Sequence, residues 1–445
     1  MHLNPAILFI PVFLLTSLCA TASGPTAAKS LLDIYLMAKQ HDIDVQIAES
    51  KYNTQILIRP IARANLLPHA SITAQTSDNR LESDGQTFGI PGRTVDFNSH
   101  GYKLNVRQAL YHRDFYVQLR QAKNSVAKAK IDLDAAHQAL IMRTASAYFD
   151  VLAAQDIVTL REFEKKAIKR QLQQAKEHFE VGLIAITDVH EAQASYDLAV
   201  VEEIEAVNAL EISKDALEVI VAQRPNRLHP LSDRMELVTP APNDPEDWVA
   251  KALQQNLVLL SSEYSNKIAQ QEIKLQRSRH LPTLDLVASY SDEDTGGLSG
   301  ARSTEDTLIG LQLNIPIAEG GRTYYTTRQA RHKAAVVQNE HEKVRRTTIR
   351  DARDTYLNVI SAISRVKALA TALESTEAAT RATEAEFQAG TRTSVDVLLA
   401  VQETFLAKRN YLRARYDYLL NTLRLKQATG TLSVDDLAKI DDWLN

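Results

Sequence analysis

The sequence contains little glycine. Only 14 of its 445 residues are glycine, whereas an average protein has about 7%. None occurs between Gly101 and Gly182, or between Gly321 and Gly390. These two gaps are rich in Ala, Gln, Glu, Lys, Arg and Leu, which are strong helix formers. We therefore expect very long helices that alternate with two short glycine-rich regions.

Cysteine is almost absent, and the single Cys19 lies near the N-terminus. The stretch from Leu3 to Ala20 is almost purely apolar, and Ala20-Thr-Ala22 supplies the small residues that signal peptidase requires. We expect residues 1–22 to be a signal peptide, with an uncleaved anchor as the alternative because no Lys or Arg precedes the apolar stretch. Leu18 stands where a lipidation signal has a small residue, so lipidation of Cys19 is not expected. The mature chain then has neither disulfides nor thiol chemistry.

Motifs for catalysis and for a spanning helix are also missing. After the leader no run of 18 apolar residues occurs, which excludes a membrane-spanning helix. The sequence has no His-Glu-x-x-His, Gly-x-Ser-x-Gly or phosphate-binding Gly-Lys-Ser/Thr motif, so we expect no enzyme, no catalytic residue, no cofactor and no metal site. The net charge of −4 gives no indication of a nucleic acid as a partner.

The most informative pattern present is an internal duplication. Phe179-Glu-Val-Gly182, running to Asp188-Val189, recurs as Phe387-Gln-Ala-Gly390, running to Asp396-Val397. Leu67-Pro68 likewise recurs as Leu281-Pro282. A duplicated chain usually builds one pseudo-symmetric object, so features shared by both copies define the architecture.

Each copy is predicted to contain a helix, two strands, a long helix, a tight corner and another long helix. The first copy spans residues 23–222, with one helix from Leu31 to Leu66, strands at about 68–77 and 99–109, and helices at about 112–181 and 188–222. The second spans 246–429, with strands at about 281–291 and 307–316 and helices at about 321–389 and 394–429. Residues 223–245 are predicted to be a connector against the helices, and residues 430–445 a tail in the same equatorial region.

The predicted strands have one apolar and one polar face. Tyr102, Leu104 and Val106 alternate with polar residues, as in strands of outer-membrane barrels. Four strands cannot close a barrel, which needs about eight, and lipid excludes open edges, so several chains must assemble one. The alternative is a water-soluble protein with two hairpins on a core. The polar segments Ser77–Ser99 and Ser291–Asp306 are predicted to be long loops.

The helix predicted at about 112–181 is too long for a globular core. At 1.5 Å per residue it extends roughly 100 Å. It must therefore pack along its length against other helices, in coiled-coil contacts.

Four runs in the sequence resemble the TolC family of outer membrane efflux proteins, and the resemblance covers essentially the whole mature chain in order. These runs are Phe179-Glu-Val-Gly-Leu-Ile-Ala-Ile-Thr-Asp-Val189, Gly390-Thr-Arg-Thr-Ser-Val-Asp-Val397, His280-Leu-Pro-Thr-Leu-Asp-Leu286 and Pro316-Ile-Ala-Glu-Gly-Gly321.

The resemblance implies an α+β membrane protein. A homotrimer would form one twelve-stranded barrel in the outer membrane of a Gram-negative bacterium, in contact with its lipid, and a coiled-coil barrel of helices through the periplasm. It also implies a periplasmic adaptor (membrane fusion) protein and an inner-membrane transporter of the RND, ABC or MFS type as partners, docked near the corners at Gly182, Val189, Gly390 and Val397. The chain would be the exit duct of an efflux pump or type I secretion system, its cargo unspecified.

The family closes the inner end of its tunnel with polar links between helices. Matched to that pattern, Arg392 would donate and Thr187 and Asp188 would accept, which suits the planar, permanently charged guanidinium. An alternative role for Asp188 is a helix cap, because Asp188-x-x-Glu191 is also a capping box. Phe387 stands where the family has a linking tyrosine, so it lacks that hydroxyl; helix packing is its alternative role.

Asp396 matches an aspartate that rings the tunnel entrance in the family. Three carboxylates in a narrow throat favour cations and disfavour anions. Leu399 stands where a second aspartate ring is expected, so we expect weaker entrance charge and weaker block by divalent cations. A soluble periplasmic coiled-coil adaptor is the competing assignment, but it does not require the apolar faces of the strands.

Overall fold

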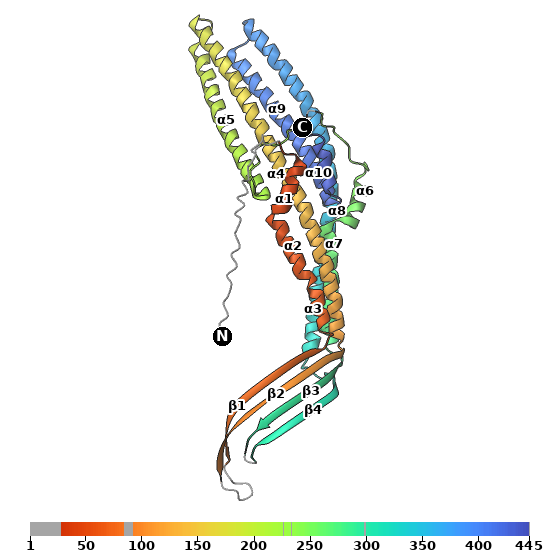
Figure 1. Ribbon diagram of the computed structural model, residues 1–445. Helices are drawn as coiled ribbons and strands as arrows, with labels where there is room; N and C mark the ends of the chain where they lie inside the picture. Colours follow the sequence, from red (N-terminus) through yellow and green to blue (C-terminus); the bar gives the residue numbers. More distant parts are fainter. Residues whose placement is uncertain (1–27, 84–91, 226, 233, 298–299, 445) are drawn as a thin grey trace, which may run out of the picture.

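The computed structural model describes residues 28–83, 92–225, 227–232, 234–297 and 300–444. The predicted signal peptide and Cys19 lie outside these residues. The molecule is elongated, with a bundle of long helices at one end and a sheet at the other (Figure 1). No helix among the described residues combines the length and apolar character needed to cross a membrane.

Both copies contain helices, two strands and two long helices in that order, but three helices precede the strands in the first copy and two in the second. The first contains α1 (Leu31–His41), α2 (Ile43–Ile56), α3 (Ile58–Ala64), β1 (His69–Ser83), β2 (Arg93–Tyr111), α4 (Arg113–Glu180) and α5 (Ile186–Val221). The second contains α6 (Pro245–Gln255), α7 (Leu257–Ser278), β3 (Thr283–Thr295), β4 (Arg302–Asn314), α8 (Arg322–Gln388) and α9 (Ser394–Ala428), followed by α10 (Val434–Asp441).

The prediction of one continuous helix from Leu31 to Leu66 was wrong, because Asp42 interrupts it. The Asp42 carboxylate accepts the Val45 N–H at 2.9 Å and caps α2. In the second copy Asn256 accepts the Leu259 N–H at 2.9 Å between α6 and α7. Short polar side chains offer the backbone an alternative to the helical hydrogen bond, which breaks the helix at both places.

The sheet is antiparallel in the order β1-β2-β3-β4. The strands are longer than predicted, because β1 pairs with β2 as far as Ser83↔Arg93, and β3 with β4 as far as Thr295↔Arg302. Much of Ser77–Ser99 and Ser291–Asp306 is thus strand, and the prediction of long loops there was wrong. In these outer parts of the strands, polar side chains face each other across the sheet where apolar pairs would otherwise stand. For example, the Asn98 amide donates a hydrogen bond to the Asp78 carboxylate at 3.1 Å.

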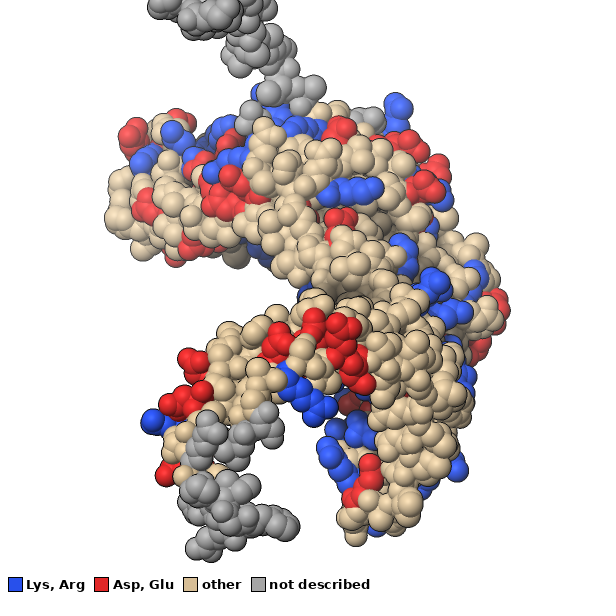
Figure 2. All heavy atoms as spheres, turned by 60° about the horizontal axis from the view of Figure 1, so that its bottom comes forward, with Lys and Arg blue, Asp and Glu red and all other residues tan. Residues whose placement is uncertain are grey.

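The sheet is open at both edges. Among the described residues β1 pairs only with β2, and β4 only with β3. In Figure 2 the sheet end comes forward, and its strands form a curved arc, hollowed on one side, with carboxylates gathered along it. Large apolar side chains on the outer strands are exposed, with Ile72 at 71%, Ile309 at 77% and Leu311 at 67%. The sheet thus has two unpaired edges and an uncovered apolar face.

The largest core lies midway along the helices, where the connector crosses them. Tyr148 of α4 is fully buried, and its hydroxyl donates to the His229 carbonyl at 2.9 Å. The Tyr418 hydroxyl of α9 accepts the Val238 N–H at 2.8 Å. Leu231 forms a β-bridge with Leu444 of the tail. Connector, tail and long helices therefore share one core, and the tail also contains α10, which the sequence had not indicated.

Candidate functional site: the two helix corners

The two corners adopt the same turn, at the end of the long helices opposite the sheet (Figure 1). Gly182 and Gly390 both have φ of +76°, a conformation that glycine adopts without steric cost. Leu183 N–H donates to the His178 carbonyl at 2.8 Å, and Thr391 N–H to the Glu386 carbonyl at 3.0 Å. These are Schellman caps, so each long helix ends in a fixed geometry and the chain turns back along it.

At the second corner Asp396 belongs to a reciprocal capping box at the start of α9. Its carboxylate accepts the Thr393 N–H at 2.9 Å and the Thr393 hydroxyl at 2.8 Å, and its own N–H donates to Thr393 Oγ1 at 3.2 Å. The hydrogen bonds from Thr393 lower the pKa of Asp396. The carboxylate is therefore held charged and fixed in direction.

The first corner lacks such a cap. The N-cap of α5 is Ala185, which has no side-chain hydrogen bond. The alternative role of Asp188 as a helix cap was therefore wrong, because the helix starts earlier, at Ile186. Asp188 lies inside the first turn, where the helix dipole favours a carboxylate, and it accepts a long hydrogen bond of 3.4 Å from the Thr187 hydroxyl.

Arg392 pairs within its own corner. Its Nε donates to Glu386 Oε2 at 2.9 Å, and both side chains are about half exposed. Within the described part of this single chain, Arg392 makes no hydrogen bond to Thr187 or Asp188. Glu386 is not among the partners of Arg392 expected from the sequence. The sequence does contain a signal for this ion pair: two residues of opposite charge lie close together in the chain, on either side of the turn at Gly390.

Phe387 joins the two corners by packing. Its ring stacks on His178, with centroids 5.4 Å apart and planes 22° apart. His178 is at the end of α4 and occupies the same position in the first copy as Glu386 in the second. The contact of His178 with Phe387 was not predicted from the sequence, because neither periodicity nor spacing relates residues at the ends of two separate helices.

The valines that follow the corners face inward. Val397 is fully buried, and Val189 packs against a small core to which Leu398 also belongs. The rest of this core is Ile168, Leu172, Ala175, Ala192 and Ala199 of the first copy. Leu399, by contrast, is 56% exposed. The two helix pairs thus share a core just behind their corners.

The described residues contain no group of three or more His, Cys, Asp or Glu side chains arranged to hold a metal ion. At the second corner Arg392, Thr393 and Asp396 bond to neighbouring backbone and side chains. Such an arrangement positions helix ends.

Fold and corners together define a duplicated, elongated protein of long helices with a small open sheet. Comparison with known sequences assigns it: residues 37–223 and 248–431, one stretch for each copy, match the profile of the outer membrane efflux protein family. The chain belongs to this family, which agrees with the resemblance seen in the sequence, and it is an outer membrane protein of the Gram-negative type.

Individual relatives extend along nearly the whole chain. Outer membrane protein TolC of Vibrio cholerae is 35% identical over 439 residues, which cover 98% of each chain. Alkaline protease secretion protein AprF of Pseudomonas aeruginosa is 28% identical, covering 92% of this chain and 86% of its own. Among solved structures, the outer membrane channel CmeC of Campylobacter jejuni superposes with a TM-score of 0.79 at 16% identity, covering 99% and 98% of the two chains. That likeness supports the fold.

Proposed function

We propose that the protein is an outer membrane channel that forms the exit duct of a tripartite efflux pump or a type I secretion system. The observation that carries the proposal is the open sheet: two unpaired edges and an apolar outer face cannot remain uncovered in lipid. Three chains supply twelve strands, enough to close a barrel around a lumen.

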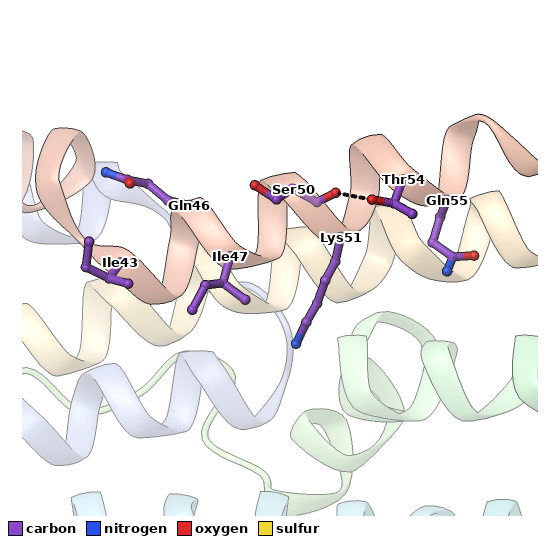
Figure 3. A pocket seen from close by; sticks show the side chains of 7 residues that line it. All are labelled: Ile43, Gln46, Ile47, Ser50, Lys51, Thr54 and Gln55. Atoms are coloured by element: carbon purple, nitrogen blue, oxygen red, sulfur yellow. Dashed lines mark hydrogen bonds between the residues drawn. The ribbon is translucent and has the colours of Figure 1, made fainter.

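Exposed apolar helix faces support the same assembly. On α2, Ile43 and Ile47 lie along one groove with Gln46, Ser50 and Lys51 (Figure 3). On α5, Leu198 and Ile204 are 64% and 63% exposed. A second copy packed against these faces covers them in the way that long helices cover one another in a bundle.

The partners are an adaptor protein in the periplasm and an inner-membrane transporter of the RND, ABC or MFS type. They dock at the corners around Gly182 and Gly390, and the duct passes whatever the transporter delivers. Relatives named for efflux and for protease secretion support this general role.

The corners form the gate of the duct. Arg392 of one chain links to Thr187 and Asp188 across neighbouring corners in the closed state, and Asp396 rings the entrance. The exposure of Arg392, at 51%, leaves its guanidinium accessible to a second chain.

Fractionation and planar bilayers test the proposal. The expected result is a trimer in the outer membrane fraction that dissociates on heating and gives discrete conductance steps after reconstitution. A monomer in the soluble periplasmic fraction that yields no conductance contradicts the proposal and favours the soluble adaptor.

A further inference from the structure

A polar cavity lies between the two copies, part of the way along their long helices. It encloses about 260 Å³ and is formed by residues of α4, α5 and α9, which lie side by side in this half of the molecule (Figure 1). Along α4 it lies between Ala153 of the large core and Ile168 of the small core behind the corners. The apolar packing of one copy on the other is therefore interrupted here.

Glu164 is a buried carboxylate in this cavity. Its side chain is only 6% exposed, and it accepts a hydrogen bond of 2.5 Å from Arg161 Nη1, one turn earlier on α4. The same nitrogen donates to Glu202 of α5 at 2.6 Å. Arg409 of α9 also lines the cavity, and within the described part of the chain it forms no ion pair and acts on Glu164 by its charge alone. The cluster thus holds two cations and two carboxylates, with one cation from the second copy.

Burial makes the charged form of Glu164 unfavourable. Burial raises the pKa of Glu164, the hydrogen bond from Arg161 and the charges of the two arginines lower it in part, and the charge of Glu202 raises it further. The neighbouring cation Lys165 is occupied by Glu203 of α5. A buried carboxylate without a close partner on every side is costly when charged, and the cost is relieved when water reaches it.

These charges are absent from the matching places of the other helix pair. The alignment of the two corner glycines gives the residues that match Arg161, Glu164, Glu202 and Arg409, and all four are neutral. They are Leu369, Ala372, Asn410 and Val201. A long helix pair of the same shape forms without them, so the cluster belongs to the contact between the pairs rather than to the fold of either pair.

We propose that this cluster is a pH-dependent contact between the two helix pairs: a proton on Glu164 holds α9 against α4, and loss of the proton favours separation of the pairs. The proposal deepens the proposed function, on which it rests for the meaning of that separation, namely opening of the duct at the corners. Glu164 is 18 residues before Gly182, so the contact is about 27 Å from the first corner along α4.

The direction of the response follows from where the carboxylate is buried. When α9 moves away from α4, water enters the cavity and the pKa of Glu164 falls towards its ordinary value. The arrangement with the higher pKa binds the proton more tightly and gains population as pH falls. Acid therefore favours the packed arrangement, and neutral pH favours separation.

The test follows the cavity with a nitroxide spin label. Leu406 lines the cavity and is 48% exposed, and no cysteine follows Cys19 in the sequence, so Leu406→Cys can be labelled at one place in the purified protein. Electron paramagnetic resonance then measures the accessibility of the label to a water-soluble nickel complex. Each unit by which the pKa of Glu164 differs between the arrangements changes their ratio up to about tenfold, so accessibility is expected to be several-fold greater at pH 7.5 than at pH 5.

Three variants of the labelled protein sharpen the test. Glu164→Gln keeps the shape and an acceptor for Arg161 but cannot ionise, so accessibility is expected to stay at its acid value at both pH values. Arg409→Gln removes a cation that favours the charged form, so the transition is expected at higher pH. Glu162→Gln is the matched control: Glu162 is exposed on α4 and does not line the cavity, and its variant is expected to respond as the labelled parent does.

Three outcomes overturn the proposal. These are equal accessibility of the labelled parent at both pH values, a full pH response in Glu164→Gln, and an unshifted transition in Arg409→Gln. Circular dichroism and the oligomer on a native gel establish that each variant is folded.

Planar bilayers separate this proposal from the proposed function. Discrete conductance steps without a response of the label contradict the pH-dependent contact alone. A response of the label in a protein that gives no conductance contradicts the channel function alone. If both hold, acidification lowers the conductance of the wild type more than that of Glu164→Gln, in which any remaining pH dependence belongs to Asp396 at the entrance.

Discussion

His178 at the end of α4 stacks on Phe387 at the end of α8, with ring centroids 5.4 Å apart. It is a direct contact between the tips of the two long helices, one from each copy. Because each helix ends in a fixed turn at Gly182 or Gly390, this stack sets the separation of the two corners. Movement of one corner away from the other must break it.

Phe387→Ala is expected to loosen the corners. An aromatic pair contributes about 0.5–1.5 kcal/mol beyond its burial, so the closed-state conductance in planar bilayers should rise several-fold. His178→Ala should give a similar rise, and the double variant should be less than additive because both changes remove one contact. Phe387→Tyr keeps the ring and adds the hydroxyl of the family's linking tyrosine, so its conductance should not rise above that of the wild type. Full additivity of the two alanine variants contradicts a shared contact.

Arg392→Ser is expected to raise the single-channel conductance, because it removes the donor of the proposed link to Thr187 and Asp188. Glu386→Gln is the matched variant: it removes only the ion pair within the corner and leaves Arg392 available to the neighbouring chain. The expected result is an open-shifted channel for Arg392→Ser and near wild-type conductance for Glu386→Gln. Equal conductance of Arg392→Ser and wild type removes the latch role.

Asp396→Asn is expected to weaken cation selectivity while preserving the start of α9. The amide can still accept the Thr393 hydrogen bonds but carries no charge. Reversal potentials in a salt gradient measure the change, and Leu399→Asp should shift them the other way and tighten block by divalent cations. Unchanged selectivity and unchanged block in Asp396→Asn remove the ring proposal.

The pH dependence of that selectivity follows from the lowered pKa of Asp396. A carboxylate whose folded pKa is lowered contributes stability that is present above its unfolded pKa and is lost as pH falls through the folded value. The Thr393 hydrogen bonds should therefore keep Asp396 charged to a lower pH than in a chain without them, against the mutual repulsion of the three carboxylates in the proposed ring, which acts in the opposite direction. Reversal potentials recorded from pH 7 down to pH 4 test this, with Thr393→Ala as the variant in which the loss begins at higher pH.

The long helices could be predicted from the sequence, because glycine is missing over long stretches that end at Gly182 and Gly390. The strand positions could also be predicted, because apolar residues alternate at Tyr102 and Leu104. The strand lengths could not: residues such as Asp78 and Asn98 look like loop residues in isolation, and it is their backbone pairing across β1 and β2 that makes them strand.

The corner site was predictable only in part. Repetition located Gly182 and Gly390, and family resemblance suggested Arg392 and Asp396. The contact of His178 with Phe387 depends on how two distant helices approach each other, which no local pattern encodes. Similarly, the sequence did not show that Asp42 ends one helix and caps the next, because its carboxylate is positioned by the fold: it accepts the Val45 N–H and is held by Arg143, whose Nη2 donates to both carboxylate oxygens at 2.8 Å.

The ends of α5 and α9 provide a stability prediction from the duplication. Ala222 and Gly430 match in the two copies, and both have positive φ, 56° and 75°. A left-handed backbone costs about 1–2 kcal/mol for a residue with a side chain. Part of that is offset because glycine has more freedom in the unfolded chain. Ala222→Gly should therefore stabilise the protein by up to about 1 kcal/mol.

Gly430→Ala should act in the opposite direction, and more strongly. Besides the backbone cost, an added Cβ meets the backbone of Gln255 and Asn256, which cannot move aside as a flexible side chain can. We expect a loss of more than about 2 kcal/mol. Unfolding midpoints of both variants, scanned at one rate with the wild type, measure the two shifts. A midpoint for Gly430→Ala at or above that of the wild type contradicts the close approach of α9 to the α6–α7 junction.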